Sequence, residues 1–323
     1  MEDSCPETRE SFDLEQFEEK LARMLSQVEG AGETRVILTL DSGDRRVLAR
    51  DEERDGEGGS TSTVVTVEGS SGEQGVVPLQ TVAPQFRGAL VVCPGGGYES
   101  ISAHEDDPVA LDFLAHGCQA FVLTYSIGEE AKDFRPLKEL SETVRRIREN
   151  AAQWRVDPEK IAVCGFSAGG HLAASLGTLW NDPEFLKHYD SHGGQNRPNA
   201  MILGYPVITA DEFAHEGSLR HVSGCQPGEP GYRYFSLEQH VTKDTCPAFL
   251  WHTMDDDCVP VENSFAMAAA LHRAGIPCEA HFFPSGIHGL SVCTQEIGMP
   301  HPHNAQWMDL CLRWLESTFG YTL

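Results

Sequence analysis

Short apolar runs alternate with amphipathic stretches along the chain from residue 88 onward. The runs are rich in β-branched and aromatic residues and carry almost no charge, which is typical of parallel strands covered on both faces. They predict six strands at residues 89–93, 120–125, 160–164, 200–205, 248–252 and 279–283. Because helical patterns separate these runs, the chain is expected to form a doubly wound, mostly parallel α/β sheet with helices on both faces.

Three of the intervening stretches have the clearest helical period. Residues 261–275 end at a glycine that suits a helix C-terminus, and residues 304–320 place two tryptophans and a cysteine on one face. Residues 136–154 repeat apolar side chains in steps of three and four. These are Leu137, Leu140, Val144, Ile147, Ala151 and Trp154.

The first 85 residues follow a different pattern. Residues 14–28 predict an amphipathic surface helix, and residues 34–40 and 45–50 flank a turn-rich Asp-Ser-Gly-Asp joint that suits a hairpin. A charged, glycine-rich linker precedes two further short strands at residues 63–67 and 75–79. We therefore expect an acidic N-terminal extension over residues 1–85 and one α/β domain over residues 86–323.

Charge and composition exclude several classes of partner. Lys and Arg total 24 against 49 Asp and Glu, so the formal net charge is −25 and we expect neither a nucleic acid nor an anionic membrane as partner. The chain contains no apolar run of eighteen residues and no secretory signal, and its ten cysteines lie singly, without a C-x-x-C pair. These features predict a cytoplasmic protein with reduced thiols.

The motif Gly-Phe-Ser-Ala-Gly at residues 165–169 proposes a nucleophile. Gly-x-Ser-x-Gly occurs by chance in unrelated chains, but here it follows a predicted strand and opens a helical stretch. A strand that turns sharply into a helix through this motif exposes the serine at the turn and needs small residues around it. We therefore take Ser167 as the candidate nucleophile.

A serine hydroxyl needs a base and a third group that orients the base. Asp255, Asp256 and Asp257 follow the predicted strand at 248–252, and His288 follows the predicted strand at 279–283. The order Ser, Asp, His along the chain is the order of α/β-hydrolase triads. Residue types alone leave open which aspartate serves.

A glycine run after the first predicted strand of the α/β domain suits an oxyanion hole. The loop holds Gly95, Gly96 and Gly97, with no side chains to block the approach of a substrate. A phosphate-binding loop is disfavoured because the G-x-x-x-x-G-K-[ST] pattern is missing. The amide of Ala168, at a helix N-terminus, would supply the second donor.

Other residues near these motifs have several interpretations. His171 suits capping or packing of the helix, and Cys164 suits a small apolar role in the strand. Tyr98 and Tyr205 suit either a substrate pocket or simple packing. The His301-Pro-His303 stretch suits a loop more than a metal site, so we expect no metal and no cofactor.

Five segments together carry a family resemblance: CPGGGY, GFSAGGHLAAS, GYPVIT, PAFLWHTMDDDCVPVENS and IHGLS. They resemble the acetylesterase and acetylxylan-esterase-like branch of the α/β-hydrolase superfamily, relatives of the hormone-sensitive-lipase type. The resemblance runs from about Arg87 to the C-terminus and implies that residues 86–323 are the catalytic domain. It leaves the N-terminal extension unexplained.

The resemblance also implies roles for single residues. Ser167 would be the nucleophile and His288 the base, and Asp256 would be the acid because it stands three residues before Val259-Pro260, with Asp255 as the fallback. The Gly95 and Gly96 amides would correspond to the oxyanion loop of the HGGG type. Pro94 stands where many relatives carry histidine.

The activity implied by the resemblance is that of a metal-independent serine carboxylesterase. Its substrates would be small-molecule short acyl esters, acetyl esters of sugars or oligosaccharides among them. A peptidase or an acyltransferase on the same fold, or a non-catalytic hydrolase-fold binding protein, are the alternatives. The first 85 residues could add strands to the sheet, cover the site or mediate self-association, so a homo-oligomer stays open.

Overall fold

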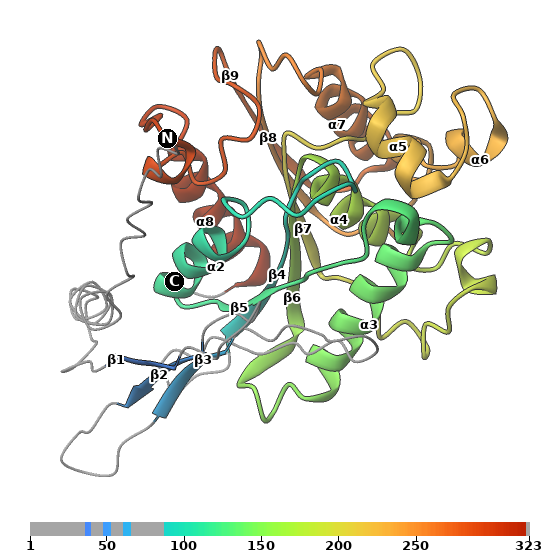
Figure 1. Ribbon diagram of the computed structural model, residues 1–323. Helices are drawn as coiled ribbons and strands as arrows, with labels where there is room; N and C mark the ends of the chain where they lie inside the picture. Colours follow the sequence, from blue (N-terminus) through green and yellow to red (C-terminus); the bar gives the residue numbers. More distant parts are fainter. Residues whose placement is uncertain (1–35, 40–47, 53–60, 66–86, 321–323) are drawn as a thin grey trace, which may run out of the picture. The chain divides into compact units, whose positions relative to one another are not determined.

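The computed structural model describes residues 36–39, 48–52, 61–65 and 87–320, and the chain divides into two compact units, Met1–Val82 and Ala83–Leu323 (Figure 1). In the first unit, the described residues form a three-stranded antiparallel sheet. Its strands, in spatial order, are β1 (Val36–Thr39), β2 (Leu48–Glu52) and β3 (Thr61–Val65).

The predicted hairpin is confirmed by the pairing of β1 with β2, in which Val36 lies opposite Asp51. The predicted strand at 63–67 is found slightly earlier, as β3. Among the described strands, these three form a sheet of their own rather than extending the larger one. The predicted helix at 14–28 and strand at 75–79 lie outside the described residues.

The second unit is built on six parallel strands, all of them at the positions that the apolar runs predict. Their order across the sheet is β5-β4-β6-β7-β8-β9. The strands are β4 (Arg87–Cys93), β5 (Gln119–Val122), β6 (Val156–Phe166), β7 (Ala200–Gly204), β8 (Ala248–Thr253) and β9 (Cys278–Phe283).

The strand order places the site. The chain passes from β4 to β5 in one direction and then returns past β4 to form β6 on the other side. The loops that leave the carboxyl ends of β4 and β6 therefore diverge, and open α/β sheets bind their ligands at such a switch point. The glycine run after β4 and Ser167 after β6 both lie at this point.

Helices cover both faces of the sheet (Figure 1). α2 and α8 lie on one face, where Phe113 and Trp307 pack together, and α3, α4 and α7 lie on the other. The segment between β7 and β8 carries two further short helices. The helices are α2 (Asp107–Ala115), α3 (Arg135–Glu149), α4 (Ser167–Leu179), α5 (Glu216–Ser223), α6 (Pro230–Arg233), α7 (Glu262–Ala274) and α8 (Gln306–Phe319).

Burial explains why the helices differ in composition. α4 is buried along its whole length, so it has no polar face and consists mainly of small and apolar residues. α3 buries only one stripe, including Leu140 and Val144, and exposes charges opposite. It ends at Glu149, before the predicted limit of 154, and the chain then turns through Arg155, whose backbone is left-handed with φ of 53°, into β6.

None of the described helices combines the length and the apolar character needed to cross a membrane. The cysteines of the described residues form no disulfide.

Candidate active site

Ser167 occupies the junction at which β6 passes into α4 with no residue between them. Its backbone is left-handed, with φ of 53°, a conformation that costs energy for any residue with a Cβ. This strained turn places Ser167 at the carboxyl edge of the sheet. The sequence prediction of a serine at a strand-to-helix turn is therefore confirmed in its geometry.

The glycines around Ser167 are required by close backbone contacts. A Cβ on Gly165 would lie 2.0 Å from Gly169 O, and a Cβ on Gly169 would lie 2.0 Å from Cys93 O. A Cβ on Gly170 would lie 2.8 Å from the Cβ of Pro206. Any larger side chain would push α4 away from β4 and β6, so these positions fix the turn that carries the serine.

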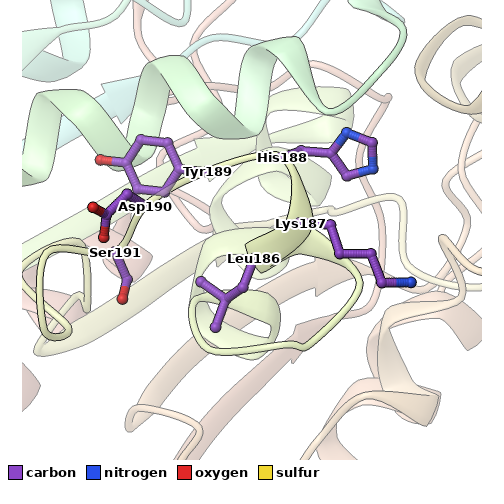
Figure 2. Close-up of a pocket in the computed structure, with 6 residues that line it drawn as sticks. All are labelled: Leu186, Lys187, His188, Tyr189, Asp190 and Ser191. Atoms are coloured by element: carbon purple, nitrogen blue, oxygen red, sulfur yellow. The ribbon is translucent and has the colours of Figure 1, made fainter.

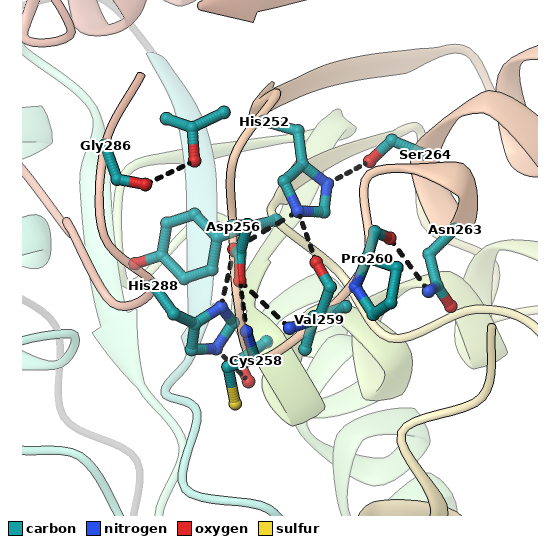
Figure 3. A network of polar contacts seen from close by, with 12 residues as sticks. His252, Asp256, Cys258, Val259, Pro260, Asn263, Ser264, Gly286 and His288 are labelled. Atoms are coloured by element: carbon teal, nitrogen blue, oxygen red, sulfur yellow. Dashed lines mark hydrogen bonds and ion pairs between the residues drawn. The ribbon is translucent and has the colours of Figure 1, made fainter. Parts of the chain in front are cut away.

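His288 reaches Ser167 from the loop after β9. Its Nε2 lies 2.8 Å from Ser167 Oγ. Its Nδ1 lies 2.7 Å from Asp256 Oδ2 (Figure 3). Because an ionised carboxylate only accepts hydrogen bonds, Nδ1 carries the proton and Nε2 accepts the serine hydroxyl. The structure thus brings together three side chains that are up to 121 residues apart in the sequence.

The carboxylate of Asp256 is held from several directions. Its Oδ1 accepts the backbone N–H groups of Cys258 and Val259, each at 2.9 Å, and its side chain is 1% exposed. On the side away from His288, His252 Nε2 lies 3.3 Å from Oδ2 (Figure 3). Burial alone would raise the pKa of Asp256, but the hydrogen bonds from His252, His288 and Val259 outweigh it and hold the pKa well below its usual range.

Asp255, the alternative acid, has a different partner. Its Oδ1 accepts the Gly286 N–H at 2.7 Å, two residues before His288. Asp255 therefore holds the backbone of the loop that carries His288, and its recorded partner is not the imidazole. Of the two candidate aspartates, Asp256 is the one beside His288.

The glycine loop departs from expectation at one of its amides. Gly95 lies against the turn, since a Cβ on it would be 3.0 Å from Ser167 Cβ, but its N–H donates to Glu105 Oε2 at 2.8 Å. That amide is already used, so it is not available to an oxyanion. The N–H groups of Gly96 and Ala168 have no acceptor among the described residues. Ala168 is the second residue of α4, and such a residue has no acceptor within its helix. These two amides therefore remain as candidate oxyanion donors.

The segment between β7 and β8 borders the glycine loop. His221 Nδ1, on α5, lies 3.0 Å from Gly97 O. The Oγ of Ser218, on the same helix, lies 3.9 Å from the position that a Cβ on Gly97 would take. α5 therefore closes one side of the site.

Several residues with open interpretations have a packing role. His171 is fully buried, with Nδ1 2.9 Å from Tyr98 Oη and Nε2 3.1 Å from Phe235 O, and burial lowers its pKa to about 4. Tyr98 and Tyr205 are buried as well, and Cys164 is enclosed in the core of the sheet. In the part of the chain that the structure describes, no group of three His, Cys, Asp or Glu side chains is placed to hold a metal ion.

Two buried polar residues at the site did not stand out in the sequence. Glu105 lies in a loop without periodicity, and no short motif marks it. His252 is the second-last residue of β8 and stands four residues before Asp256, so a histidine near a strand end followed by an acid is the signal that could have indicated it.

A surface hollow elsewhere contains none of these residues. It is lined by six consecutive residues, 186–191, that follow the C-terminal end of α4 (Figure 2). Ser167 is the first residue of α4, so the 13-residue helix, about 20 Å long, separates the two places. The hollow is thus not part of the candidate site.

The chain is similar to known proteins in sequence and in fold. Endo-1,4-beta-xylanase B of Butyrivibrio fibrisolvens is 39% identical over 219 residues, which are 65% of this chain and 34% of that protein. The acetylxylan esterase of Xylanibacter ruminicola is 32% identical over 216 residues, 64% of this chain and 42% of that protein. The chain thus spans between about a third and two fifths of the length of these curated relatives.

A solved structure matches more completely. The acetyl ester-xyloside bifunctional hydrolase from Caldicellulosiruptor lactoaceticus superposes with a TM-score of 0.67 at 36% identity, over 76% of this chain and 88% of that one. The predicted fold is therefore confirmed, and the predicted class, an ester hydrolase, agrees with the names of these relatives.

Two family models match the chain. A shorter match, to the SpoIIIAG C-terminal domain, covers residues 13–104 and includes β4, which belongs to the six-stranded sheet. The BD-FAE model matches residues 81–271, more than half of the chain. Because that match runs from before β4 into α7 and contains the loops after β4, β6 and β8, the chain belongs to the BD-FAE family of α/β hydrolases.

Proposed function

We propose that the protein is a serine carboxylesterase that hydrolyses short acyl esters, with its activity in residues 86–323. The observation that carries this proposal is the unbroken series of contacts from Asp256 through His288 to Ser167, at 2.7 and 2.8 Å. Such a series activates a hydroxyl for attack on a carbonyl carbon. The names of the similar proteins support the same chemistry.

In the first half of the reaction, Ser167 Oγ attacks the ester carbonyl and His288 Nε2 takes its proton. Asp256 keeps the imidazole in the tautomer that can accept this proton and stabilises the imidazolium that forms. The negative charge on the carbonyl oxygen is stabilised by the N–H groups of Gly96 and Ala168. His288 then gives its proton to the leaving alcohol, and an acyl-enzyme remains.

In the second half, water replaces the alcohol. His288 accepts a proton from the water, whose oxygen attacks the acyl carbon bound to Ser167. The same two amides stabilise the tetrahedral intermediate; the bond between the acyl carbon and Ser167 Oγ then breaks, His288 returns its proton to Oγ, and the acid is released. The chain's own residues supply the nucleophile, the base and the oxyanion donors.

For the substrate we propose acetyl esters of sugars or oligosaccharides. Two of the similar proteins carry names that join acetyl esters with xylan or xyloside chemistry, which supports this class. Both curated relatives are much longer than this chain, so their further activities are not carried over.

The test is ester turnover by a matched pair of variants. Ser167→Ala should abolish hydrolysis of p-nitrophenyl acetate, butyrate and acetylated xylo-oligosaccharides. Ser175→Ala is the control, because Ser175 is a buried serine of the same helix whose hydroxyl donates to His171 O. Retention of most of the rate by Ser167→Ala, or loss of the wild-type rate on addition of EDTA, would overturn the serine mechanism.

A further inference from the structure

Glu105 is a buried carboxylate beside the candidate site. It lies in the loop between β4 and α2 and is 2% exposed. Among the described residues no ion pair involves it, although an enclosed carboxylate without a cation carries a high desolvation cost. Costly groups of this kind concentrate at functional sites.

Both oxygens of Glu105 receive a hydrogen bond. Gly95 N–H donates to Oε2 at 2.8 Å, and Tyr205 Oη lies 2.7 Å from Oε1. The tyrosine oxygen also accepts the Ser291 N–H at 2.8 Å, so its own proton points to Glu105. Burial, and then the charge of Glu105, raise the pKa of Tyr205, which keeps this proton in place.

These bonds connect three loops at the carboxyl edge of the sheet. Gly95 follows β4, Tyr205 follows β7, and Ser291 stands three residues after His288 in the loop that follows β9. A further bond, from Ser291 Oγ to the backbone oxygen of the residue before Glu105, closes the connection.

Both ends of this connection contact the reacting groups. A Cβ on Gly95 would lie 2.5 Å from Glu105 Oε2 and 3.0 Å from Ser167 Cβ, so Gly95 is held tightly between the two. At the other end, the Tyr205 ring meets the His288 ring edge to face, with centroids 4.9 Å apart. Glu105 therefore sets the position of the glycine loop against the nucleophile and, through Tyr205, that of the imidazole.

We propose that Glu105 is a positioning residue of the esterase reaction: its carboxylate fixes the glycine loop so that the Gly96 and Ala168 amides converge on one point, and fixes His288 through Tyr205. This proposal rests on the proposed function. Donors aimed at an oxyanion act only once charge has developed, so misplacing them lowers kcat and leaves KM almost unchanged.

The test compares Glu105→Gln with Glu139→Gln in the full chain. Glu139 is also a buried glutamate that accepts one backbone N–H and one hydroxyl, both from Ser126, and it differs from Glu105 in having a cation, Arg135, 3.5 Å away. These contacts involve neither the glycine loop nor the histidine loop. In Glu105→Gln one acceptor oxygen becomes an NH2 donor, so the side chain cannot accept from both the Gly95 N–H and the Tyr205 hydroxyl, and one of the two bonds is lost.

We expect Glu105→Gln to lower kcat by about 10- to 100-fold, less than the loss of a whole oxyanion donor, with KM within about twofold. Glu105→Asp, one methylene shorter, should not restore the rate, and Tyr205→Phe should show a smaller kcat loss. Glu139→Gln should lower the melting temperature and keep kcat. An unchanged kcat in Glu105→Gln, or equal losses of kcat in the two Gln variants, would overturn the proposal.

Amide hydrogen exchange separates this proposal from the proposed function. Glu105→Gln should speed exchange in residues 94–100 and 286–292, and Glu139→Gln should not. If the wild type hydrolysed no ester, the esterase assignment would fail. The exchange data would still test whether Glu105 holds the two loops in place. Unchanged exchange in both segments would refute the positioning role of Glu105.

Discussion

The two halves of the candidate site are fixed in different ways. The nucleophile half, residues 165–170, is built within one strand-to-helix turn, where glycines allow backbone contacts that any side chain would prevent. The acid–base half consists of Asp256 and His288, which arrive on loops after β8 and β9 and meet through side-chain hydrogen bonds. Local geometry therefore sets the first half, and the parallel topology of the sheet sets the second.

The difference has a consequence for mutation. A substitution in the nucleophile half should act on folding as well as on chemistry, because backbone atoms are in contact there. A substitution in the acid–base half should act on chemistry first, because Asp256 and His288 lie on loops and meet only through side chains. The predictions below separate these two behaviours.

The largest effect is expected when either half loses its reacting group. Ser167→Ala and His288→Ala should each lower kcat by at least about 10⁴-fold, and the double variant should be no slower than either single one, since the two groups act as a unit. Pre-steady-state and steady-state turnover of p-nitrophenyl acetate measures this. Additive losses in the double variant would mean that the serine and the imidazole act separately.

The next effect distinguishes two adjacent acids. Asp256→Asn should lower kcat by about 10⁴-fold, because the imidazole would then lose the partner that fixes its tautomer. Asp255→Asn should cost less than about tenfold, since Asp255 accepts only the Gly286 N–H. Steady-state kinetics of both purified variants measures these losses. A larger loss of kcat in Asp255→Asn than in Asp256→Asn would show that Asp256 is not the acid of the triad.

A stability effect should appear in the nucleophile half. Gly169→Ala would place a Cβ 2.0 Å from Cys93 O, so we expect a loss of about 3 kcal/mol or more in the free energy of unfolding. Gly217→Ala is the matched control on a helix, because its nearest neighbour would be 3.7 Å away, and it should be neutral or stabilising by about 0.5–1 kcal/mol. Urea unfolding of both variants measures the two changes in the free energy of unfolding. Equal changes would contradict the prediction.

The smallest effect is a pH dependence in the acid–base half. The pKa of Asp256 is lowered in the folded protein, so its contribution to stability is present above the unfolded value of about 3.9 and is lost as the pH falls toward the folded value. The difference in unfolding free energy between wild type and Asp256→Asn should therefore shrink from pH 6 to pH 3. A constant difference would show that the carboxylate gains nothing from its partners.

The sequence predicted the parts of this molecule that depend on local patterns. The six strands of the large sheet lie at their predicted positions because apolar runs of this length have few other solutions in an α/β chain. The turn at Ser167 could be predicted for a similar reason, as its motif combines three small residues with a strand on one side and a helix on the other.

Contacts between residues far apart in the sequence could not be predicted from local patterns. Nothing in the residues around Gly95 indicates that its amide is used by Glu105, since the acid lies ten residues away in a loop without periodicity. The choice between Asp255 and Asp256 depends likewise on where the loop after β9 returns. The end of α3 at Glu149 is not visible in the apolar pattern, which continues to Trp154, next to the left-handed backbone of Arg155.

The central claim is that Ser167 is made nucleophilic by His288. Its most direct test is covalent labelling with a fluorophosphonate, followed by intact-mass measurement and peptide mapping of wild type and His288→Ala. The account predicts one adduct per chain, located on Ser167, and almost none in the variant. Adducts on another serine, or equally fast labelling without the imidazole, would contradict it.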